Sequence, residues 1–491
     1  MFEVVIIGAG PAGLTLGAEL SANGVNCLIL EKRVERSNQS RAFSLTPHTL
    51  ELLETRGIAE IFLRQGVKCE FAPLGDGKNM LSFRRLKTRF PYLLSISQDK
   101  TEHILEEWAA QCGVNIMYGA ELIDLYQNKN QVDIIYRHES QLQHIQADYV
   151  IGCDGVSGKV SNLADIAVTK IQYKHSLMHG DVKLKNPPEA NVFAKTSRRG
   201  MVAIFPVTQD VYRVLALDQE RMHVPIHKQV TLKEFKTSVK ALSNRDFEIN
   251  SPLWLNRFRC QQRHAVTYRK GRIFLAGDAA HTQLPAGGQG LQISIQDGFN
   301  LGWKLAAVIK NGAATALLDT YESERRPLIY KAMRRSIIMY RYEIAQDKLS
   351  RILKWTANKL LNISFMQNYV VRELAGLTIK YPTTQKMLFL NKNITGSKIT
   401  NLELIDTNGH REDLFAKMKN YKFFLIGNSY NKQIENYIKS HWEEKITYVH
   451  APNLKNEYGV NLCLLRPDSF IAWAAKSIQL TYLDKALKYH V

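Results

Sequence analysis

The chain has 491 residues, of which 45% are hydrophobic and 23% are charged, an ordinary composition for a globular protein. This composition excludes intrinsic disorder and collagen-like architectures, and the length suggests roughly three domains. Lys and Arg (65) outnumber Asp and Glu (46) by 19, so the chain is strongly basic and favours acidic partners such as nucleic acid, anionic lipid or an anionic cofactor.

The six cysteines and the amino terminus indicate a cytoplasmic protein. No two cysteines form a CxxC pair, and their gaps fit neither a zinc site nor a dense disulfide framework, so we expect reduced thiols and no metal. No apolar run reaches the roughly 18 residues that cross a bilayer. The apolar start, residues 2–18, lacks preceding basic residues and is broken by glycines, unlike a secretory signal.

The first motif predicts a nucleotide-binding βαβ unit. A strand over 2–7 leads into Gly8-Ala9-Gly10-Pro11-Ala12-Gly13, then a helix over 14–23 and a strand over 27–30 that ends at Glu31. A GxGxxG turn that opens a helix, with an acid about twenty residues later, is typical of dinucleotide binding. The glycines permit the tight turn, the approach of a pyrophosphate and close packing, and Glu31 would bind ribose hydroxyls. The unit alone leaves FAD and NAD open.

Two later strands also end in polar motifs. The strand over 147–153 ends at Asp154-Gly155, and the strand over 271–276 ends at Gly277-Asp278. Open α/β sheets bind ligands at the carboxyl ends of their strands, so Asp278 could accept a hydrogen bond from a ribityl hydroxyl. The glycine-rich turn over 284–291 precedes a helix over 293–309. It would aim free N–H groups at an acceptor such as the N1–C2=O edge of a flavin.

Together these motifs resemble the group A FAD-dependent aromatic hydroxylases. The likeness spans the chain and rests on GAGPAG…LEK, RAFSLTPHTLELLETRG, IGCDG and GRIFLAGDAAHTQLPAGGQGLQISIQDGFNLGWKLAAV…LLDTYESERRP. The chain is most similar to the branch that includes phenol, phenylpropionate and polyketide hydroxylases and rifampicin monooxygenase. The resemblance implies an α/β fold: a Rossmann-type, glutathione-reductase-like FAD-binding domain, an inserted β-sheet substrate domain, a helical linker and a C-terminal thioredoxin-like domain.

The predicted domain boundaries follow from this likeness. We expect the FAD-binding domain over 1–170 and 262–325, with about 71–97 contributing to the substrate side, and the substrate-binding sheet over 171–261. A helical linker over 326–385 begins near Pro327, and the thioredoxin-like domain covers 386–491. That last domain holds only Cys463, so it cannot perform dithiol exchange.

The resemblance implies an FAD-dependent monooxygenase. It would hydroxylate a phenolic or polycyclic aromatic substrate with NADPH or NADH and O2, through a flavin C4a-hydroperoxide. Two alternatives stay open: a flavin-dependent oxidase or reductase on the same scaffold, and an antibiotic-inactivating monooxygenase. A basic protein that keeps FAD only for structure is a non-enzymatic alternative. We expect a monomer or homodimer, a small-molecule partner and no nucleic acid.

The resemblance also assigns residues, although it identifies no catalytic side chain. Those implied to hold FAD are Gly8, Gly10, Pro11, Ala12, Gly13, Glu31, Lys32, Arg41, Gln98, Leu122, Asp154, Asp278, Pro285, Gly288, Gln289, Gly290, Leu291 and Gln292. The substrate candidates in the predicted sheet are Met201, Phe205, Pro206 and Arg213. His281, beside the Gly-Asp motif, is expected to be a hydrogen-bonded structural residue.

Three positions depart from the family pattern. Gln292 stands where the family usually has Asn, and flavin binding should survive because the backbone N–H is unchanged. Gly158 replaces a Ser and Ser161 replaces an Arg that the family links to the handling of NADPH. The missing guanidinium predicts weaker capture of the nicotinamide cofactor.

The helical segment over 328–376 is basic, with nine Lys and Arg against three Asp and Glu. Its apolar residues recur at helical spacing. We expect the apolar face to pack on the protein itself and the basic face to be solvated, so we do not expect membrane contact.

Overall fold

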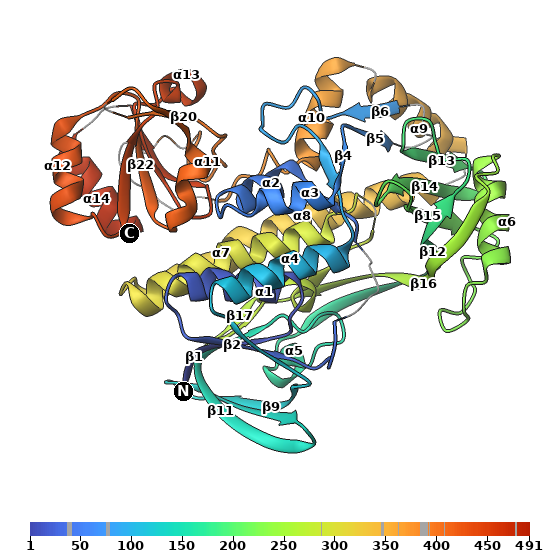
Figure 1. The fold of residues 1–491 in the computed structure, drawn as a ribbon, viewed down its shortest axis with the longest axis horizontal. Coiled ribbons are helices and arrows are strands. Elements are labelled where there is room, and N and C mark those ends of the chain that lie inside the picture. The colour runs from blue at the N-terminus through green and yellow to red at the C-terminus, as the bar shows by residue number, and fades with distance from the viewer. Residues whose placement is uncertain are drawn as a thin grey trace.

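The computed structural model describes residues 1–36, 42–74, 79–285, 287–344, 348–361, 363–382, 391, 393–406, 408–476 and 479–491. Arg41, one of the assigned FAD residues, lies outside this described part. Figure 1 shows the C-terminal region as a separate lobe on one side of a central body, with a second large sheet on the opposite side.

An eight-stranded sheet forms the centre of the body. Its order is β17-β18-β11-β1-β2-β8, and β10 pairs with β11 and β9. β1 lies between β2 and β11 and runs parallel to both, as a βαβ unit requires. The strands are β1 (Phe2–Ile7), β2 (Cys27–Glu31), β8 (Asn115–Tyr118), β9 (Glu121–Gln127), β10 (Val132–His138), β11 (Gln141–Gly152), β17 (Arg269–Lys270) and β18 (Ile273–Leu275).

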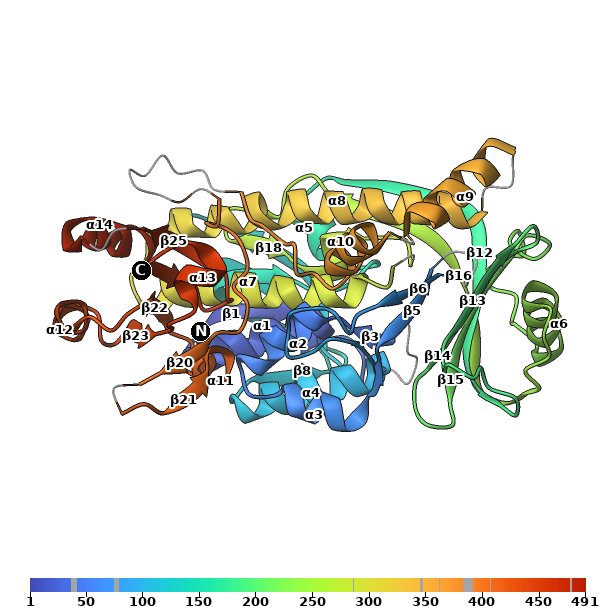
Figure 2. The same ribbon diagram turned by 90° about the horizontal axis from the view of Figure 1, so that it is seen from above.

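Three helices pack together along this sheet (Figure 2): α1 (Pro11–Ala22), α4 (Gln98–Gln111) and α7 (Gly290–Lys310). α1 and α7 approach closely because α7 carries glycines at the contact. A Cβ at Gly298 would lie 2.8 Å from the Cβ of Thr15, and one at Gly302 would lie 2.5 Å from the Cβ of Glu19. The close packing of α1 on α7 therefore fixes the relative positions of the two glycine-rich turns that precede these helices.

Short elements connect the central sheet to the rest of the body. They are β3 (Ser44–Leu45), α2 (Pro47–Glu54), α3 (Ala59–Gln65), β4 (Val67–Cys69), β5 (Phe71–Leu74), β6 (Asn79–Ser82), β7 (Leu93–Ser95), α5 (Val160–Leu163), η1 (Gly277–Ala279) and η2 (Thr315–Leu318). β7 pairs with both β3 and β4, so residues 44–45 and 67–69 belong to one small sheet.

The second large sheet has six strands in the order β13-β14-β15-β12-β16-β19. Its side chains alternate: Val202 and Ile204 of β14 are buried in the cluster that includes α6, whereas Met201 and Phe205 are half-buried on the other face. A bend at 207–210 joins β14 to β15. The elements are β12 (Val168–Leu184), β13 (Phe193–Ser197), β14 (Gly200–Pro206), β15 (Tyr212–Asp218), α6 (Leu232–Ser243), β16 (Ile249–Ala265) and β19 (His281–Thr282).

Three helices follow the body: α8 (Asp319–Ile344), α9 (Lys348–Leu361) and α10 (Ser364–Leu374). The prediction that this helical segment begins at Pro327 is wrong, because α8 begins at Asp319 and contains Pro327. The helix continues through Pro327 although an interior proline removes a backbone donor and crowds the preceding turn. The side chains of Glu324 and Arg325 before it are fixed by buried partners.

The C-terminal lobe contains a four-stranded sheet in the order β23-β22-β24-β25, with one parallel and two antiparallel pairs. Its apolar residues share a core cluster with Trp303 and Ala307 of α7, so the lobe packs on that helix. The elements are β20 (Glu403–Ile405), β21 (Arg411–Asp413), α11 (Leu414–Lys417), η3 (Met418–Asn420), β22 (Phe423–Gly427), α12 (Lys432–His441), β23 (Ile446–His450), α13 (Leu454–Tyr458), β24 (Leu462–Leu465), β25 (Ile471–Ala475) and α14 (Leu480–His490).

The single cysteine of the lobe is inert in exchange chemistry. Cys463 has no exposed surface, and burial raises the pKa of its thiol to about 12. Because the thiolate is the nucleophile in disulfide exchange, a thiol with this pKa stays unreactive near neutral pH.

Candidate active site

The first glycine-rich turn, Gly8–Gly13, combines two crowded positions with one open position. Gly8 has a φ of +108°, and a Cβ there would lie 2.5 Å from the carbonyl oxygen of Cys153; a Cβ at Gly13 would lie 2.0 Å from the carbonyl oxygen of Gly8. At Gly10, by contrast, no atom lies within 4 Å of the Cβ position. The turn is therefore packed on its inner side and open at Gly10, as the approach of a pyrophosphate requires.

The amino end of α1 is available to an anion. Gly10 is the N-cap residue, Pro11 is in the first turn and no side chain caps the helix. The backbone N–H groups of Ala12 and Gly13 therefore keep the partial positive charge of a helix start. Together with the open position at Gly10, this geometry fits a bound phosphate group.

Glu31, at the end of β2, is buried and bound on both oxygens. Its Oε2 accepts a hydrogen bond from Ala9 N at 2.8 Å, and its Oε1 accepts one from Arg33 N at 2.9 Å. Burial acts to raise the pKa of this carboxyl, but hydrogen bonds from Arg33 and from Ala9 N hold it below its ordinary value. Glu31 is thus an ionised acceptor fixed against the turn, and the sequence reading missed the role of Arg33. Lys32 between them is exposed.

Gln98 and Leu122 border this region from other elements. The Oε1 of Gln98, the first residue of α4, accepts a hydrogen bond from Ala42 N at 3.0 Å, and its Nε2 donates to Glu102 Oε1 at 2.8 Å. Leu122 is buried in β9, and its carbonyl oxygen accepts a hydrogen bond from Lys159 Nζ at 3.2 Å. Gln98 therefore anchors the chain that leads into β3.

Asp154 explains the glycine at 158. Its Oδ2 accepts a hydrogen bond from Val160 N at 2.9 Å, while its buried Oδ1 has no partner. Burial raises the pKa of this carboxyl. A Cβ at Gly158 would lie 2.1 Å from the Oδ1 of Asp154, so the serine usual in the family cannot occupy this position without a shift of the carboxylate.

Ser161 is 2% exposed, and its hydroxyl accepts a hydrogen bond from the guanidinium of Arg263 (Nη2–Oγ, 2.7 Å). Arg263, on β16, also donates to the carbonyl oxygen of Val156. A guanidinium thus lies beside position 161 although the sequence there has no arginine. An arginine at 161 would bring two guanidinium groups together in a buried site.

The Gly277–Asp278 motif is held by a buried carboxylate that the sequence reading did not single out. Asp297 of α7 has no exposed surface, and its Oδ2 accepts hydrogen bonds from Gly277 N at 2.9 Å and lies 2.7 Å from His281 Nε2. Its Oδ1 accepts one from Arg325 Nε at 2.7 Å. Burial acts to raise the pKa of Asp297, but the charges of Arg325 and His281 hold it below its ordinary value.

His281 therefore contacts a buried carboxylate, consistent with the structural role expected for it, whereas Asp278 is exposed. The role of Asp297 could have been inferred from its position in the sequence, twenty residues after Gly277. Both lie in the block that carries the family resemblance, one at the end of a strand and one on the following helix.

The second glycine-rich turn, Leu284–Gly290, is more open than the first. Pro285 and Gly288 are exposed, Gly288 has a φ of +60°, and no atom lies within 4 Å of the Cβ position of Gly290. Gln289 is the N-cap residue of α7, and no side chain caps this helix either. The amino end of α7, which includes Leu291, can therefore bind an electron-rich edge.

Gln292 ties this turn to β3. Its Nε2 donates to the carbonyl oxygens of Ser44 at 2.7 Å and Gly288 at 3.0 Å, and its Oε1 is buried without a partner. Both amide atoms of Gln283 are also buried without partners. A buried polar atom without a partner is costly, so these groups fit a site that a polar ligand completes.

Comparison with known proteins identifies the chain. A family model described as an FAD binding domain matches residues 1–336, and one described as the C-terminal part of aromatic-ring hydroxylases matches residues 392–490. The chain is a flavoprotein aromatic-ring hydroxylase. It is an FAD-dependent monooxygenase of the group A family, with the α/β fold and the FAD-binding domain that the resemblance predicted.

Its relatives cover the chain almost end to end. It is 34% identical to an uncharacterized aromatic compound monooxygenase of Bacillus subtilis, over 96% of this chain and 94% of the relative. It is 31% identical to rifampicin monooxygenase of Streptomyces venezuelae, over 98% and 97% of the two chains. Among solved structures, the anhydrotetracycline hydroxylase OxyS of Streptomyces rimosus superposes with a TM-score of 0.87 at 28% identity, over 99% of this chain and 98% of that one.

The substrate candidates of the hydroxylase fall into two groups. The ring of Phe205 lies 4.9 Å from that of Phe43, just before β3, and the carbonyl oxygen of Pro206 accepts a hydrogen bond from Ser95. Met201 is half-buried on the same face as Phe205. Arg213, however, has no exposed surface, and its guanidinium is paired with Asp181. The Arg213 guanidinium lies 5.4 Å from the ring centre of Phe43, and its charge is paired inside the protein and not presented to a pocket.

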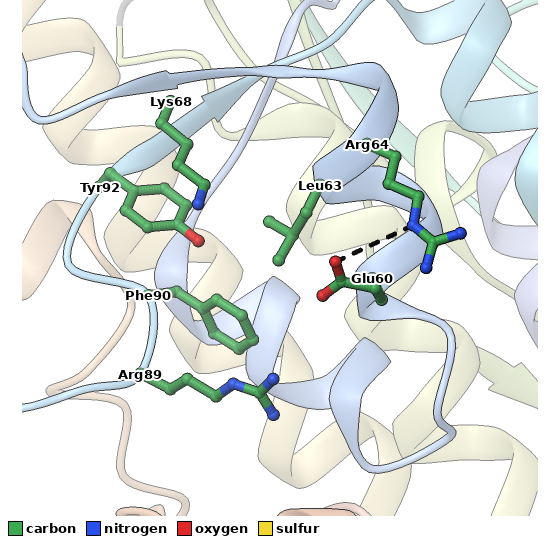
Figure 3. A pocket seen from close by; sticks show the side chains of 7 residues that line it. All are labelled: Glu60, Leu63, Arg64, Lys68, Arg89, Phe90 and Tyr92. Atoms are coloured by element: carbon green, nitrogen blue, oxygen red, sulfur yellow. Dashed lines mark ion pairs between the residues drawn. The ribbon is translucent and has the colours of Figure 1, made fainter.

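Two hollows of the hydroxylase differ in their relation to these residues. A cavity of about 60 Å³ is bordered by Thr46, Gln289, Gln292 and Arg325, next to the second glycine-rich turn. A larger pocket of about 350 Å³ lies between α3 and the segment 89–92 (Figure 3) and is lined by Glu60, Leu63, Arg64, Lys68, Arg89, Phe90 and Tyr92. The larger pocket shares no residue with the assigned FAD or substrate sets.

Proposed function

We propose that this hydroxylase inserts one atom of O2 into an electron-rich aromatic ring, with NADPH or NADH as the reductant. The observation that carries the proposal is the junction of Phe205, Phe43 and Gln292. Phe205 brings the second sheet against the segment before β3, and Gln292 binds that segment to the second glycine-rich turn. An aromatic wall thus lies next to the turn that fits a flavin edge. Bound FAD supplies the redox chemistry with O2 that amino-acid side chains lack.

The chain's own residues would divide the binding of FAD between two ends. We assign the pyrophosphate to the turn at Gly10 and the adenosine ribose to Glu31, which requires rearrangement of its hydrogen bonds with Arg33. We assign the ribityl hydroxyls to Asp278 and the flavin N1–C2=O edge to the amino end of α7. In this assignment the helix end favours the negative charge that reduction places on that edge.

The nicotinamide cofactor would bind only transiently, because the single Rossmann fingerprint of the chain is taken by FAD. Arg263 is only 5% exposed and its guanidinium is bound to Ser161 and Val156, so it does not replace the missing arginine, and we expect weak capture of the nicotinamide cofactor. We retain the predicted division into an FAD-binding domain (1–170 and 262–325), a substrate sheet (171–261), a linker (326–385) and a C-terminal domain (386–491) as part of this proposal, together with a cytoplasmic setting and a monomer or homodimer.

The substrate class that we propose is phenolic or polycyclic. Rifampicin and anhydrotetracycline, named for two relatives, are both polycyclic aromatic compounds, so an antibiotic-modifying monooxygenase is the favoured form of the proposal. A panel of phenols, tetracyclines and rifamycins would be screened by following NADPH consumption and product mass.

The deciding experiment uses 18O2. A monooxygenase places one labelled oxygen atom in the product for each NADPH consumed, whereas an oxidase yields only hydrogen peroxide and a reductase yields unlabelled reduced product. Phe205→Ala should divert the reaction from product to hydrogen peroxide, because the aromatic ring of the substrate loses the side chain that positions it. Leu142→Ala, a change at a 66% exposed site of β11, is the matched control. Equal coupling in the two variants would contradict the proposed substrate wall.

A further inference from the structure

The helices α9 and α10 carry the densest group of exposed apolar side chains in the part of the chain that the structure describes. Eight large hydrophobic residues between 352 and 369 are exposed: Ile352, Leu353, Trp355, Leu360, Ile363, Phe365, Met366 and Tyr369. Single exposed apolar residues are normal on protein surfaces, but eight of them within residues 352–369 mark a candidate interaction site. We call these eight residues the α9–α10 patch.

The expectation that this segment packs its apolar face on the protein is therefore wrong for α9. Ile352, Leu353 and Leu360 lie on one face at helical spacing, and they are 59%, 58% and 50% exposed. The expectation holds for the inner side of α10, where Val371 joins the core cluster with Phe83. Figure 2 shows α9 projecting from the edge of the body beyond α10.

The charged residues of the segment 348–372 are all basic. Between residues 348 and 372 the sequence contains Lys348, Arg351, Lys354, Lys359 and Arg372 and no Asp or Glu. Lys359 is exposed, and its Nζ lies 3.9 Å from the ring centre of Trp355. A helix in a basic segment that exposes apolar side chains together with a tryptophan and a lysine is typical of helices that lie in a membrane interface.

We propose that the α9–α10 patch docks the enzyme on the surface of an anionic lipid bilayer. The apolar face of α9 would enter the boundary between head groups and acyl chains, and the basic residues would contact anionic head groups. The attachment is peripheral, since no helix among the described residues is both long and apolar enough to cross a membrane. The proposal does not rest on the proposed substrate or reductant.

Charge favours lipid over a second copy of the chain as the occupant. A two-fold interface would place the same acid-free basic segment against itself, and like charges across an interface are unfavourable. An anionic bilayer instead compensates these charges, in line with the net charge of +19.

Flotation with vesicles tests the proposal on the whole FAD-loaded enzyme. Vesicles of phosphatidylcholine and phosphatidylglycerol in equal parts should bind the enzyme, and vesicles of phosphatidylcholine alone should bind it at least about tenfold less. Rising salt should release it, because salt screens the head-group contacts.

The triple variant Ile352→Gln, Leu353→Gln and Leu360→Gln should bind anionic vesicles at least about tenfold more weakly, since three exposed apolar side chains no longer insert. Glutamine keeps the helix propensity, and FAD content reports the fold. The control variant Leu142→Gln and Leu253→Gln changes residues that are 66% and 58% exposed elsewhere and should bind like the wild type. Trp355 is 57% exposed, so its fluorescence should shift to the blue on vesicles, and Trp355→Phe should remove that shift.

Absence of binding by the wild-type enzyme would overturn the proposal, as would full binding by the triple variant. A wild-type dimer in sedimentation that the triple variant converts to a monomer would overturn it in favour of an interface between copies.

Discussion

The two glycine-rich turns of the enzyme begin two neighbouring helices, yet they are held in different ways. The Gly8–Gly13 turn is fixed by neutral close packing, with Gly8 and Gly13 pressed against backbone atoms. The Leu284–Gly290 turn has open space around Gly290, and the Gly277–Asp278 motif beside it is held by the buried charge of Asp297. Under the proposed assignment, the phosphate end is held by backbone packing, and the flavin end is more open and lies beside buried ion pairs.

The difference has a physical basis in what each end binds. A pyrophosphate needs a backbone cradle that the chain can build without side chains, so glycine packing suffices. A flavin edge changes its charge with reduction, and it benefits from a helix end that is oriented by fixed ion pairs.

The largest effect is expected for Asp297→Asn. The change removes the charge that pairs with Arg325 and leaves that guanidinium buried without its carboxylate. Loss of one partner of a buried ion pair costs about 3–5 kcal/mol, so the free energy of unfolding should fall by that amount in urea titration. If the variant is as stable as the wild type, the Gly277–Asp278 motif is not held by the charge of Asp297.

Gly13→Ala should come next, with Gly290→Ala as its matched control. The new methyl group at 13 would collide with the carbonyl oxygen of Gly8, and forced overpacking costs about 1–3 kcal/mol. FAD should be lost on gel filtration. Alanine at 290 meets open space, so stability should stay within about 0.5 kcal/mol. Similar losses in both variants would erase the distinction between the turns.

Asp278→Ala should weaken FAD binding far more than His281→Ala does. A hydrogen bond to a charged group contributes about 1.5–3 kcal/mol, which corresponds to a change of about ten- to a hundredfold in the dissociation constant. His281 is bound to Asp297, so its removal should lower stability more than FAD affinity. Fluorescence titration of apoenzyme with FAD measures the affinity, and equal losses in the two variants would contradict the ribityl assignment.

Acid should produce the smallest and most gradual effect. Because the folded state holds the pKa of Asp297 below its ordinary value, this carboxyl stabilises the fold at pH values above that ordinary value. The contribution is lost as the pH falls through the lower, folded pKa, with a slope of at most about 1.4 kcal/mol per pH unit.

Asp297→Asn should flatten this acid dependence of the free energy of unfolding. Glu31, which binds the first glycine-rich turn, also has a lowered pKa, so Glu31→Gln is the comparison variant. Asp297 faces two basic groups in complete burial and Glu31 faces one, so Asp297→Asn should flatten the profile more. The reverse order would indicate that the first turn depends more on charge than the second.

Much of the central fold could be predicted from local pattern. The strand predicted over 2–7 is β1, and the one predicted over 27–30 is β2 except for Glu31. Both are buried on two faces, and a short β-branched run between turn residues has few alternatives. The predicted start of the helix at Pro327 is eight residues later than the observed start of α8. A proline is a local signal, whereas Glu324 and Arg325 are held by residues distant in sequence.

Local sequence was enough to predict that a glycine-rich turn opens the first helix and that Asp278 follows a strand, because glycine spacing and strand ends are local properties. The groups that surround these features depend on how distant parts of the chain pack together. The tertiary structure placed Arg263 beside Ser161, Asp297 behind Gly277 and Asp181 on Arg213, all partners separated by many residues. It also left the apolar face of α9 uncovered. Helical periodicity predicts that a face is apolar, but what covers that face depends on chain packing beyond the reach of local sequence.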